Sequence, residues 1–261
     1  MCLIVFAYKY HPKYPFILAG NRDEFYARPT QKLHEWNSDP KIYAGRDLKE
    51  GGTWLGINEH GKIAVLTNYR DLTKIKENAP SRGNIATNIL LSNEPIAEQL
   101  SGLIPEFQKY NGFNLIAGDL HNLYYVTNEK DYFSEIQPGL YGISNAFLNT
   151  PWPKTNDALQ HFTHAINGET PDEEAIFELL ANTSTYPDRM LPKTGLSPEM
   201  EKAVSSIFIL TDDYGTRSSA LVMMNQKGEI KFTEKTYRPG SVEITDSEEY
   251  QLSLSKAQIR Q

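Results

Sequence analysis

The chain has 261 residues, 39% of them hydrophobic, and its 33 acidic and 26 basic side chains give a formal net charge of −7. This length and composition suit one folded domain and exclude a largely disordered chain, while the acidic balance disfavours nucleic acid and anionic membranes as partners. The single cysteine, Cys2, excludes an intramolecular disulfide and a multi-cysteine zinc site.

The first apolar run, residues 2–8, predicts a strand. It lacks the basic start of a secretory signal, and no stretch approaches the roughly 20 apolar residues of a membrane-spanning helix. We therefore expect a cytoplasmic protein without a transmembrane segment. A second strand, residues 16–20, ends in the polar cluster Asn21-Arg22-Asp23-Glu24, and a hairpin would return this cluster beside Cys2.

A polar, proline-containing stretch leads to Glu50. Residues 53–58 and 62–69 then flank Glu59-His60-Gly61, a pattern that predicts a hairpin with Asn68 at the far end of its second strand.

Residues 70–83 have no apolar period and predict a surface loop. Apolar residues at three- and four-residue steps then predict helices around residues 85–90 and 96–104. The loop contains four basic residues that offer an anion site, although a solvated loop explains them better: Arg70, Lys74, Lys76 and Arg82.

The second half of the chain continues with groups of strands and helices. The predicted strands are residues 113–117, 123–127, 140–144, 206–211, 217–224 and 229–237, and the predicted helices are residues 157–166 and 171–180. Because strands and helices do not alternate regularly, the order indicates an α+β protein with two mostly antiparallel sheets faced by helices. We expect one domain over residues 1–261, with residues 247–261 as a loosely held C-terminal tail.

Cys2 becomes the N-terminal residue when Met1 is removed, which methionine aminopeptidases generally do ahead of a small residue. A thiol and a free amine then share one residue, and an α-amine with a reference pKa of about 7.7–8.0 can take the thiol proton. Attack on a carbonyl would give an acyl-thioester. The alternative is that Cys2 is a small hydrophobic residue of an edge strand.

Other polar residues could complete such a site. In the cluster after the second strand, Arg22 would favour the thiolate and Asp23 would hold the amine, unless the cluster is a charged turn. Asn68 and Asn145 each follow an apolar strand, where an amide either donates to an oxyanion or ends the strand. Arg217 begins an apolar strand. It would be either a second cation of the site or a partner in a salt bridge at the rim.

Short motifs follow one another in order through residues 1–237. They include Met1-Cys2, Asn21-Arg22-Asp23-Glu24, Gly51-Gly52-Thr53-Trp54, Leu66-Thr67-Asn68-Tyr69-Arg70, Gly142-Ile143-Ser144-Asn145 and Tyr214-Gly215-Thr216-Arg217. Together they resemble the NRDE family, the transport and Golgi organisation protein 2 family. That family is similar in turn to N-terminal-nucleophile hydrolases of the cholylglycine hydrolase and penicillin V acylase type, which have a four-layer αββα fold.

The resemblance implies roles for individual residues. Cys2 would be the nucleophile, with its own amine as the base, and Arg22 and Asp23 would hold it, although in those hydrolases two residues separate the arginine from the aspartate. The remaining implied residues are the oxyanion-hole asparagines Asn68 and Asn145, the distal arginine Arg217, and the substrate contacts Asn21, Trp54, Tyr69 and Arg70.

Two functions are compatible with these residues. The first is an amidohydrolase or thioesterase that cleaves a small acylated molecule through a Cys2 acyl-enzyme and requires no cofactor or metal. The second, implied by the resemblance, is a non-enzymatic carrier of haem, a lipid or acyl-CoA, with the Cys2 thiolate as a candidate axial ligand of haem iron.

Overall fold

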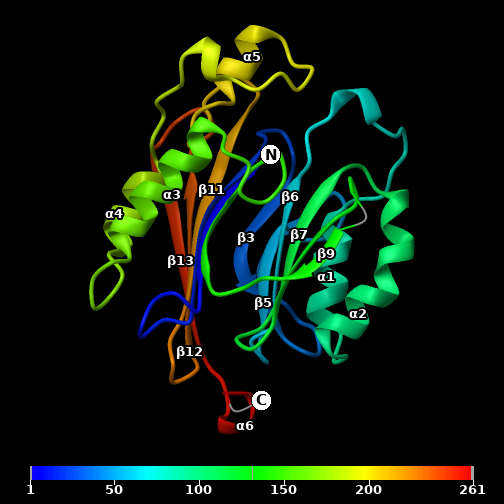
Figure 1. Cartoon of the computed structure of the whole chain (residues 1–261), viewed down its shortest axis with the longest axis vertical. Helices are drawn as coiled ribbons and strands as arrows, with labels where there is room; N and C mark the ends of the chain where they lie inside the picture. The colour runs from blue at the N-terminus through cyan, green and yellow to red at the C-terminus, as the bar shows by residue number, and fades with distance from the viewer. Residues whose placement is uncertain (1, 131, 260–261) are drawn as a thin grey trace.

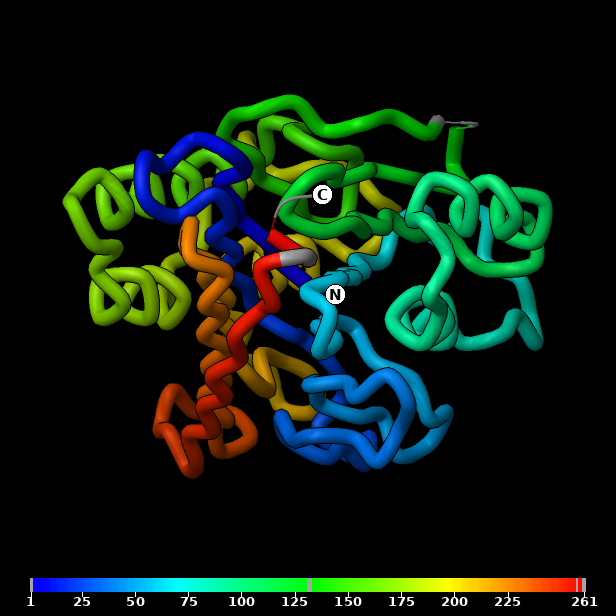
Figure 2. The backbone as a smooth tube through the Cα atoms, turned by 90° about the horizontal axis from the view of Figure 1, so that it is seen from below, coloured from blue at the N-terminus to red at the C-terminus, as the bar shows by residue number. Residues whose placement is uncertain are grey.

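The computed structural model describes residues 2–130 and 132–259, which are arranged in four layers (Figure 1). Two antiparallel sheets face each other in the centre. Helices α3 (Pro153–Ala165) and α4 (Glu173–Leu180) cover one sheet, and α1 (Gly83–Leu91) and α2 (Ile96–Leu103) cover the other. Figure 2 shows the two helix pairs on opposite sides of the molecule. The predicted αββα sandwich is therefore confirmed.

Every pairing between the described strands is antiparallel. In the described part of the chain, the first sheet has the order β10-β1-β2-β11-β12-β13 and the second runs from β3 to β9 in sequence order. The strands of the first sheet are β1 (Cys2–Tyr8), β2 (Phe16–Phe25), β10 (Gly139–Ile143), β11 (Tyr214–Met224), β12 (Glu229–Tyr237) and β13 (Ile244–Ser253). Those of the second are β3 (Thr30–Glu35), β4 (Ile42–Asp47), β5 (Leu55–Asn58), β6 (Ile63–Asn68), β7 (Phe113–Gly118), β8 (Leu123–Thr127) and β9 (Tyr132–Glu135).

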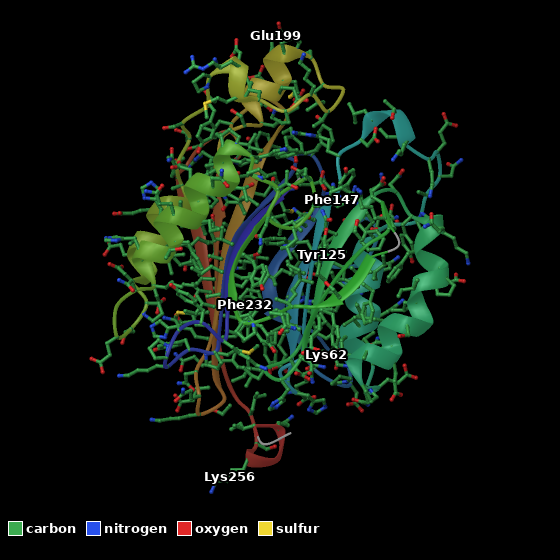
Figure 3. All side chains as sticks on the ribbon, in the orientation of Figure 1. Lys62, Tyr125, Phe147, Glu199, Phe232 and Lys256 are labelled. Carbon is green, nitrogen blue, oxygen red and sulfur yellow. The ribbon has the colours of Figure 1, made fainter. Side chains whose placement is uncertain are left out.

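Alternating side chains of the central strands enter two different cores. In β1, Ile4 and Phe6 pack between the sheets, whereas Leu3 packs against α3 and α4. This burial on both faces explains why the strand is a continuous apolar run. Phe232 of the first sheet and Tyr125 of the second both belong to the core between the sheets (Figure 3). None of the helices in the described ranges has the length and apolar character needed to span a bilayer.

Several predicted elements are confirmed. The hairpin around Glu59-His60-Gly61 joins β5 to β6, and both helix pairs form. The remaining helices are short: α5 (Pro198–Ala203), α6 (Lys256–Ile259), and the 3-10 turns η1 (Leu72–Lys74), η2 (Ile104–Lys109) and η3 (Asp188–Met190). Strands β3, β4 and β9 were not predicted, because polar residues interrupt their apolar pattern.

Two predicted segments are wrong. Residues 206–211 form only an isolated bridge, Leu210 with Gly215, because their backbone groups bond to a loop and to the start of β11 instead of a full neighbouring strand. Residues 247–253, expected to begin a loose tail, belong to β13 and pair along β12, and Leu254 is buried. In an edge strand with one exposed face, the alternation of apolar and polar residues is weak, so its sequence resembles that of a polar tail.

The close approach of Gly52 to Gly83 joins the β4–β5 connection to the start of α1. A Cβ added at Gly52 would lie 2.4 Å from the backbone carbon of Gly83. We expect Gly52→Ala to lower the free energy of unfolding by roughly 1–3 kcal/mol, because backbone must move to make room. Gly102→Ala is the control: its added Cβ meets nothing within 4 Å, and alanine in helix α2 should raise stability slightly. Urea denaturation measures both, and equal effects would contradict this account.

Candidate active site

Strand register brings Cys2 and Arg22 together. Cys2 is directly opposite Arg22, Arg22 is opposite Ser218, and Ser218 is opposite Thr236, across four neighbouring strands. Directly opposite residues share one face of a sheet, and here it is the face that carries Ile4 between the two sheets. The apolar core ends at this row of polar residues, and a groove opens there. The cluster Asn21-Arg22-Asp23-Glu24 therefore continues β2, contrary to the prediction that it ends the strand.

Arg217 owes its position to a bulge. Thr216 pairs with Asp23 and Ser218 pairs with Arg22, so Arg217 is an extra residue of β11 without a partner in the ladder. A bulge of this kind redirects a side chain at the edge of a site. The Arg217 guanidinium donates to the backbone carbonyls of Phe25 and Arg28 and lines the groove.

The groove has a volume of about 600 Å³. The Gly52–Gly83 contact, the end of β6 and the polar ends of the first sheet contribute to its wall. Six of the residues expected in the site line it: Cys2, Arg22, Asp23, Trp54, Asn68 and Arg217.

The Cys2 side chain is a buried thiol. Burial raises its pKa and the negative charge of Asp23 adds to this effect, whereas the Asp23 backbone N–H and the charge of Arg22 lower it. Because burial is the largest of these causes, the neutral thiol is favoured at rest. A nucleophilic role would therefore require a base at the moment of attack.

Asp23 lies in a buried polar cluster behind Cys2. Its Oδ1 accepts a hydrogen bond of 2.7 Å from Thr216 Oγ1, and its backbone carbonyl accepts one of 3.0 Å from the Tyr214 hydroxyl. Burial raises the pKa of the Asp23 carboxyl, and the positive charge of Lys154 and the Thr216 hydrogen bond oppose that rise. Because burial is the largest of these causes, the pKa of Asp23 stays raised in spite of these contacts.

Lys154, which the sequence analysis did not select, is the cation of this cluster. It is 3% exposed at the start of α3, and its Nζ donates to the carbonyl of Val204 at 2.9 Å. Burial lowers the pKa of Lys154 to about 8, although the negative charge of Asp23 opposes the change. The available signal was its place in Pro151-Trp152-Pro153-Lys154, a short run that closely follows the motif Gly142-Ile143-Ser144-Asn145.

The titration of Lys154 predicts a specific pH dependence of stability. Between its folded pKa of about 8 and the ordinary lysine pKa of 10.5, the unfolded chain holds more protons, so this residue makes stability rise with pH. Compared with Lys154→Met, the wild type should gain about 3 kcal/mol of unfolding free energy across this range. Urea denaturation at a series of pH values measures the difference, and parallel curves for the two proteins would refute the assignment.

The Asn145 amide is hydrogen-bonded to neighbouring segments of the chain. Its Nδ2 donates to the backbone carbonyl of Asn68 at 2.9 Å, and its Oδ1 lies 3.3 Å from Ser144 Oγ. Ser144 Oγ is also 3.2 Å from the carbonyl of Cys2. Asn145 is 1% exposed and is not among the groove residues, so it connects the ends of β10 and β6 and thereby holds Asn68 near Cys2.

Three expected substrate contacts also lie away from the groove. Asn21 faces α4, where its Nδ2 donates to the carbonyls of Leu180 and Ile207, because its neighbour Arg22 occupies the opposite face of the strand. The ring of Tyr69 packs against Phe147. Arg70 is buried 3.2 Å from Glu201 and stacks near Trp152.

Arg82, which the sequence analysis treated as part of a solvated loop, lines the groove instead. Its Nη1 donates to the carbonyl of Gly112 at 2.9 Å. Burial lowers its pKa, and the charge of Cys2 opposes that shift, so the two side chains are close enough to interact. Arg82 is thus a second cation beside the thiol, together with Arg22.

Solved structures of N-terminal-nucleophile hydrolases share this fold. Penicillin V acylase from Agrobacterium tumefaciens superposes with a TM-score of 0.51 at 12% identity, over 98% of this chain and 87% of that chain. A conjugated bile acid hydrolase from Clostridium perfringens also has a TM-score of 0.51, at 10% identity and over 98% of both chains. At these identities the likeness establishes the fold and no activity.

Sequence comparison identifies much closer relatives. The Transport and Golgi organization protein 2 homologs of Bos taurus and Homo sapiens are 36% and 31% identical to this chain. The alignments cover 90% and 97% of this chain, and 93% and 99% of the relatives. The model of the Transport and Golgi organisation 2 family matches residues 1–239. The predicted resemblance is confirmed: the chain belongs to the Transport and Golgi organisation 2 family and has an N-terminal-nucleophile hydrolase fold.

Proposed function

We propose that this protein is a cysteine hydrolase that cleaves an amide or thioester bond of a small acylated molecule through an acyl-enzyme on Cys2. The observation that carries the proposal is the position of the Cys2 thiol in the groove, opposite Arg22 and next to the backbone N–H of Asp23. A cysteine at the second position of a chain, in an N-terminal-nucleophile fold, has its thiol and its future α-amine on the same residue.

Removal of Met1 is required by this mechanism. It creates the α-amine of Cys2, whose reference pKa of about 7.7–8.0 leaves on the order of a tenth of it unprotonated at pH 7. The raised pKa of the thiol makes this base necessary, and the amine that would serve as the base belongs to the same residue as the thiol.

The reaction balances in two steps. The Cys2 Sγ attacks the carbonyl carbon while its proton moves to the α-amine, and the C–N or C–S bond to the leaving group then breaks as that proton passes to the departing atom. The product is a thioester on Cys2. Water next attacks the thioester, the amine accepts its proton, and collapse releases a carboxylic acid and returns the proton to the thiol.

Asn68 is the proposed side-chain donor to the oxyanion of each tetrahedral intermediate. It lines the groove with Cys2, and Asn145 fixes its backbone through a 2.9 Å hydrogen bond. Donors that are held in place before the reaction stabilise the developing negative charge without reorganisation. Arg22 and Arg82 add positive charge next to the sulfur.

The solved structures with the same fold support this chemistry by analogy. One is a penicillin V acylase, and the other is a conjugated bile acid hydrolase that was studied as its C2A mutant. The second protein therefore also has a cysteine at position 2. Activity does not follow from fold alone, and the proposal rests on the groove residues of this chain.

The proposal is tested with a panel of acyl-amides and acyl-thioesters. We expect intact-mass analysis to find protein without Met1, and at least one substrate to be turned over by wild type and not by Cys2→Ala. Retention of Met1 on most molecules would refute the amine-base mechanism. If no substrate shows Cys2-dependent turnover while haemin binds stoichiometrically, a carrier function would replace the hydrolase.

A further inference from the structure

Five arginines line the groove, and four of them have no carboxylate within ion-pair distance among the residues that the structure describes. One of the four, Arg46, is exposed and donates to the carbonyl of Gly51, whereas the other three are buried or half-buried: Arg22, Arg82 and Arg217. The fifth, Arg28, differs because its Nη2 lies 2.5 Å from Asp47 Oδ2. Surface arginines commonly pair with carboxylates or extend into water. Arginines that line a groove and lack such partners are typical of anion recognition.

Arg22 is the most informative of the three. It is only 9% exposed, and its Nη1 has no hydrogen-bond partner within residues 2–130 and 132–259. A buried donor without a partner is unfavourable by roughly 1–3 kcal/mol, and more when it is charged. Because this donor lies beside the candidate nucleophile, we infer that a bound molecule supplies the missing hydrogen-bond acceptor.

Arg82 and Arg217 are fixed in place by neutral acceptors. Arg82 donates to the carbonyl of Gly112, and Arg217 donates to the carbonyls of Phe25 and Arg28. A carbonyl orients a guanidinium without neutralising it, and the other N–H groups of its planar fork stay available. Burial lowers the pKa of both arginines, and the charge of Arg22 adds to the effect on Arg217.

The acidic residues near these arginines have other contacts. Glu24 interacts with both Arg82 and Arg217, but it accepts from the backbone N–H of Phe25 and lies 3.8 Å from Arg28. Glu234 accepts from the backbone N–H of Leu33 at 2.7 Å, and burial raises its pKa. The charge of Arg22 also acts on Asp23 and Glu234. No described carboxylate, however, lies within ion-pair distance of the three arginines, so their N–H groups are left for a bound anion.

Building on the proposed hydrolase function, we propose that the substrate carries a carboxylate or phosphate group that Arg82 and Arg217 bind, with the free Nη1 of Arg22 as a further donor. Both kinds of oxyanion match the planar fork of a guanidinium. The groove, at about 600 Å³, has room for an acyl chain and such a group together.

Binding to the Cys2→Ala protein tests this proposal without any need for turnover. Two matched ligand pairs are compared by isothermal titration calorimetry: N-decanoylglycine with N-decanoylglycinamide, and the O-phosphate of N-decanoylethanolamine with N-decanoylethanolamine. We expect at least one anion to bind roughly tenfold or more tightly than its neutral partner. The pair with the larger ratio identifies carboxylate or phosphate as the preferred group.

Substitution of the arginines locates the site. Arg82→Gln and Arg217→Gln should each reduce the anion-to-neutral ratio several-fold. The matched control Arg238→Gln should leave it unchanged, because Arg238 pairs with Glu243 and is not among the groove residues.

Equal binding of anionic and neutral partners would overturn the proposal, as would ratios that neither groove variant alters. These outcomes are separate from failure of the hydrolase function, which appears as a lack of Cys2-dependent turnover in the wild type.

Discussion

Replacement of Cys2 by alanine is expected to lower turnover by on the order of 10⁴-fold or more, because the variant has no atom that can form the acyl-enzyme. The fold should be retained, since one buried sulfur atom is removed from the end of β1 and the strand pairs along its whole length with β2. Initial rates with the best substrate of the acyl panel measure the effect.

Cys2→Ser is the matched control for this experiment. Serine is also small, so removal of Met1 should continue, and its hydroxyl preserves the shape of the side chain. Its higher pKa makes it a poorer nucleophile, and we expect a large but smaller loss of turnover than with alanine. Equal activity of wild type and Cys2→Ala would exclude Cys2 as the nucleophile.

The second large effect is expected at Asn68. Asn68→Ala should reduce kcat by about 10²- to 10³-fold with little change in KM, because the lost donor acts on the charge of the transition state. The exposed Asn122→Ala is a control that should leave kcat unchanged. Steady-state kinetics separate the two parameters, and a pure KM effect would assign Asn68 to substrate binding.

Asn145→Ala distinguishes a structural support from a donor. Its removal leaves the half-buried carbonyl of Asn68 without this hydrogen bond, so we expect a loss of roughly 1 kcal/mol in stability together with reduced kcat. Asn68→Ala should change stability much less. If Asn145→Ala reduced kcat at full stability, Asn145 would have to donate to the oxyanion itself. Urea denaturation of both variants gives the comparison.

The central part of the site was predictable because it depends on short-range pairing. An apolar strand, a turn and a second strand return Arg22 to Cys2, and this is the observed register. Side chains alternate between the two faces of a strand, so Asn21 and its neighbour Arg22 cannot both face the groove.

Other features depend on contacts between distant segments. Asn145 donates to the carbonyl of Asn68 across the two sheets, and nothing near Asn145 in the chain indicates this direction. Arg82 and Lys154 are hydrophilic residues in polar or proline-rich segments, and only the packing of the sheets and α3 explains why Lys154 is buried and Arg82 half-buried. Strand β13 escaped prediction for a related reason, because only one of its faces contacts the rest of the protein.

Mass spectrometry of the acid-quenched reaction tests the acyl-enzyme most directly. Protein is mixed with a substrate that shows turnover, quenched within the first catalytic cycles, digested, and analysed for the N-terminal peptide. We predict that this peptide begins at Cys2 and carries the mass of the acyl group on sulfur, and that Cys2→Ala carries none. An acyl group on another residue, or its absence from Cys2 under conditions where deacylation is rate-limiting, would contradict the proposed mechanism.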